Sequence, residues 1–246
     1  MKPRSFTAFL VFAGVSAISL APVFGASFRA LAWNSPISEV FYSPSGDPAK
    51  LEPFEAYTHA RSDAYQLSEG VGTVRFYRKE SQPDGTEKAV EVASANLSKA
   101  GQDALVILFD NRQRPGRYFT EVLDDSAASF RGGGFRFVNY TPVPVGVALG
   151  DEKARLAPKE AMIINGKPRT IGQVDNVLDV SVFVLADKTP RQVFGNIWAH
   201  NPSVRNLVFI VQVPGLQNAY EVKRITDNPA ERLEMEARAA KANSSQ

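Results

Sequence analysis

The stretch from Arg131 to Gly150 constrains the fold of this chain more than any other. Phe135 and Phe137 alternate with polar residues, a Thr-Pro-Val-Pro run interrupts the pattern, and alternation resumes from Val145 to Leu149. A period of two is typical of a β-strand with one buried face, because successive side chains point to opposite faces. Proline lacks the amide donor that a strand ladder needs. The stretch therefore predicts two strands, joined as a hairpin.

Short segments of this kind recur along most of the chain, separated by turns rich in Gly, Pro, Asn and Asp. The apolar run 104–109 is continuous, which predicts a strand buried on both faces. Residues 35–53 are rich in Pro, Ser, Gly and Asp and predict a long loop around Val40–Tyr42. Strands are predicted over 28–33, 54–60, 73–79, 89–95, 104–109, 118–123, 135–140, 145–149, 155–158, 161–165, 178–185, 193–199, 207–213 and 220–225.

The two halves of the chain are similar at an offset of 102 residues. This offset lays Asp103–Phe109 on Arg205–Val211 and Tyr118 on Tyr220 without a gap. The predicted fold class is therefore all-β, with two tandem immunoglobulin-like β-sandwich domains at 26–128 and 129–227, or one larger sandwich. Residues 228–246 are predicted to form a short exposed helix, with Pro229 in its first turn, and a disordered tail.

Residues 1–25 have the pattern of a secretory signal peptide. Lys2 and Arg4 precede an apolar run of about 15 residues, shorter than the ~20 that span a bilayer as a helix. Cleavage after Gly25 predicts a periplasmic or secreted bacterial protein with no stable membrane span. Removing those two cations from the 28 basic residues leaves 26, which equal the 26 acidic residues. The neutral balance predicts no nucleic-acid partner.

Cysteine is absent, which excludes disulfides, thiolate metal sites and cysteine nucleophiles. The only histidines are His59 and His200, and neither has a second ligand at helical or hairpin spacing. His200 follows the predicted strand 193–199 and precedes Asn201-Pro202, which favours a turn or surface role. The chain contains no Gly-x-Ser-x-Gly or His-Glu-x-x-His motif. We therefore predict no catalytic, cofactor-binding or metal-binding residue.

Four other groups of residues suggest sites, each with a plainer structural alternative. Asp124-Asp125 with Asp110 suggests a carboxylate pair or calcium site, but acidic residues also end strands. Arg131–Gly134 suggests a phosphate loop, but a strand follows it where a P-loop has a helix, so a linker is favoured. The third group is an aromatic and basic sugar-binding face, made of Arg75, Tyr77 and Arg78 or of Tyr57 and Tyr65, but such residues are also ordinary in half-buried strands. The fourth is the pair of glycosylation patterns at Asn96 and Asn139, which also arise often by chance.

The segment Gly133–Pro142, GGFRFVNYTP, resembles the strand-Asn-x-Thr-Pro entry of immunoglobulin-like modules. It looks like uncharacterised bacterial exported immunoglobulin-like β-sandwich proteins and, more weakly, the second domain of periplasmic pilus-assembly chaperones. The chaperone resemblance implies strand addition and two basic anchors for a subunit carboxylate. Arg29 and Lys99 do not stand in matching contexts, so no site residue is transferred.

These observations predict an exported, non-catalytic β-sandwich protein with a binding or structural role in the cell envelope. Its partner would be an envelope protein or a polysaccharide. Two alternatives stay open: a chaperone-like protein that acts by strand addition at a sheet edge, and a carbohydrate-binding module or hydrolase.

Overall fold

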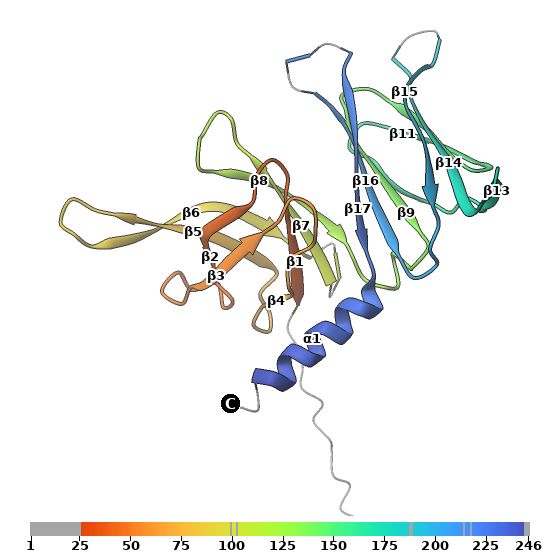
Figure 1. The fold of residues 1–246 in the computed structure, drawn as a ribbon. Helices are drawn as coiled ribbons and strands as arrows, with labels where there is room; N and C mark the ends of the chain where they lie inside the picture. Colours follow the sequence, from red (N-terminus) through yellow and green to blue (C-terminus); the bar gives the residue numbers. More distant parts are fainter. Residues whose placement is uncertain are drawn as a thin grey trace, which may run out of the picture.

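The computed structural model describes residues 26–98, 100–101, 103–186, 189–213, 215–216 and 218–243, so the signal segment lies outside the described part. The fold is all-β with one short helix, as the sequence predicts (Figure 1). The elements are β1 (Ser27–Ala32), β2 (Ile37–Tyr42), β3 (Glu52–Ala56), β4 (Tyr65–Gln66), β5 (Thr73–Ser81), β6 (Glu87–Asn96), β7 (Asp103–Asp110), β8 (Tyr118–Asp124), β9 (Phe135–Tyr140), β10 (Val145–Leu149), β11 (Glu152–Leu156), β12 (Ala161–Ile164), β13 (Arg169–Ile171), β14 (Val174–Val184), β15 (Arg191–Ala199), β16 (Arg205–Gln212), β17 (Tyr220–Asp227) and α1 (Pro229–Asn243).

The strands form four sheets, and each sheet draws its strands from one half of the chain. The first half contributes the sheets β4-β1-β7-β8 and β3-β2-β5-β6. The second contributes β12-β9-β16-β17 and β11-β10-β14-β13, with β15 paired to β14. Apart from β13, the two halves have the same pairing, including a parallel pair, β1 with β7 and β9 with β16. The β7–β8 register, Leu105 opposite Leu123, recurs 102 residues later as Leu207 opposite Ile225.

Three apolar cores separate the four sheets. One core lies between the two sheets of the first half, and a second lies between those of the second half. The third, here called the central core, joins the halves: Leu31, Leu105 and Ile107 from the first pack with residues such as Leu207 and Phe209 from the second. Sheets β4-β1-β7-β8 and β12-β9-β16-β17 are therefore covered on both faces, which explains the continuous apolar runs in β7 and β16. The prediction that 104–109 is buried on both faces is confirmed for Ala104–Leu108.

The predicted hairpin of 135–140 and 145–149 is wrong. Strand β9 and strand β10 lie in different sheets, and the Thr-Pro-Val-Pro segment is the crossover between them. Asn139 holds this crossover, because its side-chain amide donates hydrogen bonds to the carbonyls of Val143 (2.9 Å), Leu156 (3.2 Å) and Ala157 (3.1 Å). The Asn139 side chain is fully buried, so this glycosylation pattern is inaccessible in the folded protein.

The predicted loop over 35–53 is also wrong in part, because it contains strand β2 and the first residues of β3. Glu39 has a φ of 57°, and the β2–β3 register shifts between Ile37 and Val40. This irregularity breaks the alternation by which a strand is recognised in a sequence. Strands β4 and β13, of 2 and 3 residues, were not predicted either.

The linker between the halves packs closely against the second half. Phe130 is fully buried, and the amide of Gly133 donates to the carbonyl of Val204 at 3.0 Å. A Cβ atom at Gly132 would lie 2.4 Å from the carbonyl oxygen of Pro202, so a larger residue would displace the backbone. The Arg131–Gly134 segment is therefore a packed joint, followed by strand β9.

Helix α1 leaves the end of β17 and crosses beneath the first half (Figure 1). Glu236 of the helix accepts hydrogen bonds from Arg29 of β1 at 2.8 and 3.1 Å. Leu233 and Met235 point to solvent, with exposed fractions of 58% and 57%. The helix is exposed on one side, as predicted, but its charged side joins the two halves.

Candidate binding cleft between the two halves

A cleft opens between the halves at the end of the central core away from helix α1. Each parallel strand pair runs towards it, so that the carboxyl ends of β1, β7, β9 and β16 meet there. Two hollows of about 500 and 610 Å³ share Phe109 and Tyr140 as walls. We call the two together the central cleft. Its lining residues are Trp33, Asn34, Phe109, Arg112, Phe119, Thr120, Glu121, Tyr140, Thr141, Pro142, Pro158, Lys159, Val211, Gln212, Glu221 and Lys223.

Aromatic rings form the floor of the central cleft. Trp33 lies 5.4 Å from Phe109 and 5.1 Å from Phe209, and Tyr140 stacks on Phe209 at 5.7 Å. Such contacts are worth about 0.5–1.5 kcal/mol each beyond the burial of the rings. The rings come from both halves, so the floor is rigid only while the halves stay together.

Two polar groups of the floor are partly withdrawn from water. The hydroxyl of Tyr140 is buried beside the carboxylate of Glu121. Burial, and after it the charge of Glu121, raises the pKa of Tyr140 far above its ordinary value, so the hydroxyl stays protonated. Burial also lowers the pKa of Lys223, whose ammonium lies 4.8 Å from the Trp33 ring and donates to the Trp33 carbonyl at 3.2 Å. Charged residues complete the lining beside the rings: Arg112, Lys159 and Lys223 are cations, and Glu121 and Glu221 are carboxylates.

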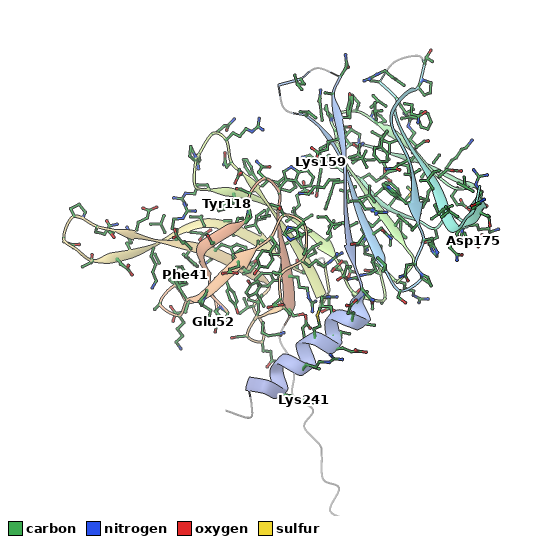
Figure 2. All side chains as sticks on the ribbon, viewed as in Figure 1. Phe41, Glu52, Tyr118, Lys159, Asp175 and Lys241 are labelled. Atoms are coloured by element: carbon green, nitrogen blue, oxygen red, sulfur yellow. The ribbon has the colours of Figure 1, made fainter. Side chains whose placement is uncertain are left out.

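The mouth of the cleft carries an exposed aromatic side chain. Phe119 of β8 is 58% exposed, although it lines the larger hollow. Opposite it stand Pro142, Pro158 and Lys159 of the second half, and Lys159 has a φ of 65°. Figure 2 labels Tyr118, the strand neighbour of Phe119, and Lys159 on the two sides. Phe119 is the one of the exposed large apolar side chains of the described residues that lines the cleft.

A buried charge network closes the opposite end of the central core. Asp125 accepts two hydrogen bonds from Arg61, at 2.8 and 3.0 Å, and one from Arg205 at 3.2 Å. Arg205 also pairs with Asp227, which lies 3.2 Å from Arg232 of helix α1. The network joins the first half, the second half and the helix through side chains that are almost wholly buried.

The electrostatics of this network favour its charged form. Burial acts to raise the pKa of Asp125, but Arg61, then Arg205 and Arg232, outweigh it, so that the pKa of this carboxyl is lowered. Arg205 also donates to the backbone carbonyls of Asp125 (2.8 Å) and Phe130 (3.2 Å). These bonds fix the linker, and with it the angle between the halves. The network is a structural clamp that sets the walls of the central cleft.

The histidines and the acidic group predicted as alternatives do not form a site. His59 is exposed, and the ring of His200 stacks on Phe135 at 6.5 Å. Asp110 lies opposite Tyr118 and Asp124 opposite Ala104, so the two carboxylates are at opposite ends of the β7–β8 hairpin. Within the described ranges, no three His, Asp or Glu side chains gather as metal ligands would.

The predicted aromatic and basic face does not form either. Tyr77 is buried beside a register shift in β5, Arg75 pairs with Glu91 at 3.8 Å, and Arg78 donates to Tyr118 at 3.3 Å. Tyr65 packs on the first core, and Tyr57 bonds to Glu55. Arg29 is held by Glu236, and Lys99 lies outside the described residues.

Sequence reasoning missed the residues that do form the cleft. Trp33, Phe109, Tyr140 and Lys223 are up to 190 residues apart, as in the Lys223 bond to Trp33. The one available signal is that three of them end or follow an apolar run. That position, together with the repeat, would have placed them at one edge of paired sheets.

The fold and the cleft define the class: a tandem β-sandwich protein with a cleft between its halves. No family model matches the chain, and no curated protein matches it. A solved structure of the two C2 domains of extended-synaptotagmin 2 matches over 91% of this chain and 99% of that chain, with 10% identity and a TM-score of 0.25. At that TM-score the likeness carries no argument about function. No helix in the described part of the chain is long and apolar enough to cross a membrane.

Proposed function

We propose that this chain is an exported, non-catalytic binding protein of the bacterial cell envelope that holds a partner in the central cleft. The observation that carries the proposal is the pair of hollows that share Phe109 and Tyr140, with Phe119 exposed at their mouth. Concave sites that combine aromatic rings with placed polar groups are typical of binding sites. The signal pattern of residues 1–25 supports export to the periplasm or medium.

The non-catalytic part of the proposal is supported by the placement of the histidines. His59 and His200 line neither hollow of the central cleft. Charged groups that line the central cleft, such as Arg112, Glu121 and Lys159, are suited to orient a ligand. An envelope protein or a polysaccharide is the proposed partner class.

Site-specific photo-crosslinking tests the proposal. p-Benzoylphenylalanine replaces Phe119 at the cleft mouth or, as a matched control, Val174 of β14, which is 59% exposed and lines neither hollow of the cleft. Each protein is irradiated in an envelope extract of the producing organism. We expect discrete adducts from position 119 and none from position 174. Equal labelling from the two positions, or no adduct from position 119, would refute a partner in the cleft.

Strand addition is the second candidate function. Strand β6 pairs with β5 on one edge, and β8 pairs with β7 on one edge, so each leaves its other edge without a strand partner in the described structure. An extended peptide could pair with such an edge. Hydrogen exchange separates the two functions: slowed exchange along the whole of β6, Glu87–Asn96, on partner binding would favour strand addition, and unchanged exchange at residues 87–90 would favour the cleft.

A further inference from the structure

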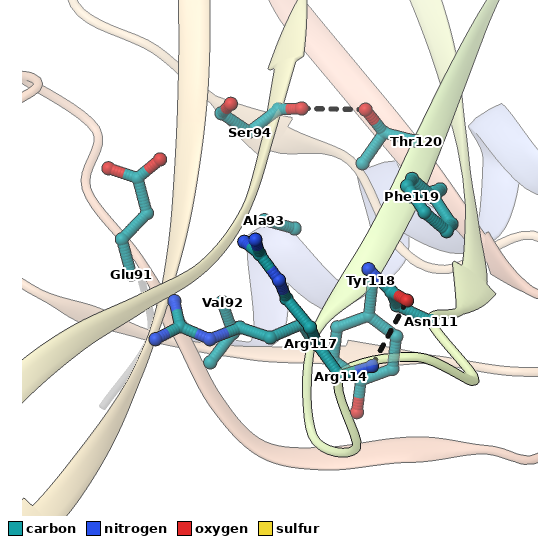
Figure 3. A pocket seen from close by; sticks show the side chains of 10 residues that line it. All are labelled: Glu91, Val92, Ala93, Ser94, Asn111, Arg114, Arg117, Tyr118, Phe119 and Thr120. Atoms are coloured by element: carbon teal, nitrogen blue, oxygen red, sulfur yellow. Dashed lines mark hydrogen bonds between the residues drawn. The ribbon is translucent and has the colours of Figure 1, made fainter.

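A third hollow, of about 530 Å³, lies where strands β6 and β8 approach each other at the side of the first half. Its walls are residues Glu91–Ser94 of β6, Tyr118–Thr120 of β8, and the turn that joins β7 to β8 (Figure 3). The Thr120 hydroxyl closes its end by donating to the carbonyl of Ser94 at 2.6 Å. We call this hollow the arginine slot.

The arginine slot has an excess of unpaired positive charge. Arg114 and Arg117 line it, and Figure 3 shows their side chains reaching from the turn towards β6. Neither forms an ion pair with any residue that the structure describes, and the same holds for Arg78 behind Tyr118. Glu91, the one acidic residue of the lining, is engaged by Arg75 at 3.8 Å. Guanidinium groups bind carboxylates through paired hydrogen bonds, which makes an anion the expected ligand.

The turn that carries these arginines is ordered by its own hydrogen bonds. The side-chain oxygen of Asn111 accepts from the amides of Gln113 (3.0 Å) and Arg114 (3.2 Å). The amide of Arg117 donates to the carbonyl of Arg114 at 3.1 Å, and that of Asn111 to the carbonyl of Arg117 at 2.9 Å. Because the backbone is fixed before binding, a ligand does not have to order it, which favours affinity.

The arginine slot adjoins the central cleft. Phe119 and Thr120 line both, and Phe119 is the exposed ring at their boundary. A ligand that occupies both hollows must place an apolar group on Phe119 and an anionic group beside Arg114 and Arg117. A polypeptide carries apolar and acidic side chains in succession. An acidic polysaccharide carries its carboxylates at a regular repeat and meets a ring only through the C–H face of a sugar, so separate apolar and acidic side chains match Phe119 and the two arginines better.

We propose that the arginine slot binds acidic side chains of an extended protein segment whose apolar residues lie in the central cleft. This inference rests on the proposed function, and it identifies the partner as a protein with an acidic and apolar segment.

Phage-displayed random decapeptides test the inference, selected in parallel against the full mature protein, the R114E/R117E variant and the F119A variant. The control variant R155E/R238E reverses the charge of two exposed arginines that line neither the arginine slot nor the central cleft. We expect the mature protein and the control to enrich peptides with Asp or Glu beside apolar residues. A synthetic selected peptide should lose at least about tenfold in affinity on R114E/R117E, because two charge-assisted contacts are lost, and should bind more weakly at high salt. R114Q/R117Q, which removes charge without reversing it, should show a smaller loss in the same direction.

Two results would overturn the inference. The first is selection without acidic enrichment, or the same peptides selected by R114E/R117E. If such peptides still depend on Phe119, the proposed function stands and only the arginine slot is refuted. If the mature protein retains neither a peptide nor a polyuronate, the cleft proposal fails as well. The second is binding of a polyuronate such as alginate that R114E/R117E abolishes, with no peptide selected, which would assign the slot to a polysaccharide.

Discussion

Replacement of Asp125 by asparagine tests the clamp that joins the two halves. The Asp125 side chain is only 3% exposed and is the sole charged partner of Arg61 among the described residues. Asparagine has a similar shape, but it leaves Arg61 buried without a counter-charge, while Arg205 keeps Asp227. Removing one partner of a buried ion pair costs about 3–5 kcal/mol. Because Arg205 is still paired, we expect a loss near the lower bound, about 3 kcal/mol, against a total stability of about 5–15 kcal/mol.

Equilibrium unfolding in urea, followed by tryptophan fluorescence, measures this loss. Trp33 reports on the central cleft, and Trp198 reports on the core of the second half. The control is D179N, because Asp179 pairs with Arg169 at the surface, where their side chains are 40% and 62% exposed. Surface pairs contribute about 0–1 kcal/mol. A loss below about 1 kcal/mol in D125N, equal to that of D179N, would show that the network does not stabilise the fold.

Three further predictions concern stability. Leu207→Ala should cost about 2–5 kcal/mol in urea unfolding, because Leu207 is fully buried in the central core; a loss below that range would mean that the halves are held mainly by charge. Since the pKa of Asp125 is lowered in the fold, its contribution is full above about pH 4 and is lost as the pH falls through the folded value; acid titration of unfolding should therefore be less steep for D125N. Gly132→Ala should destabilise by about 1–3 kcal/mol through its clash with the Pro202 carbonyl, whereas Gly72→Ala, with open space around it, should change thermal stability by less than about 0.5 kcal/mol; equal effects would refute the close packing of the linker.

The strands could be predicted from the sequence wherever a regular burial pattern repeats. β7 and β16 are continuous apolar runs because sheets cover both of their faces, and the offset of 102 residues matches their bounds. β2 was missed because its register shift removes the alternation. The false hairpin at β9 and β10 has a similar cause: alternation shows that two segments are strands, but it does not show which sheet each one joins.

The candidate site could not be predicted in the same way. Its residues share no motif, because they are brought together by the packing of one sheet on another. The Asp124-Asp125 pair shows the difference: the sequence suggests a shared carboxylate site, yet Asp124 bonds to the nearby Ser126 amide while Asp125 reaches Arg205, 80 residues away. The arginines of the slot are close in sequence, but their lack of acidic partners is a property of the folded surface.

The central core has a consequence for how such a chain can assemble. The matching strand registers make Leu105 of the first half correspond to Leu207 of the second half. The parallel strand pairs make Leu31 correspond to Val138 in the same way. The halves therefore meet through corresponding faces, as subunits do in an isologous two-fold dimer. The chain is a covalent pseudo-dimer, and one half made alone would expose a self-complementary apolar face. Glu121 and Lys223 also occupy corresponding positions in the two halves, and they carry opposite charges at the cleft. The cleft is therefore asymmetric in charge, and it can distinguish the two ends of a ligand.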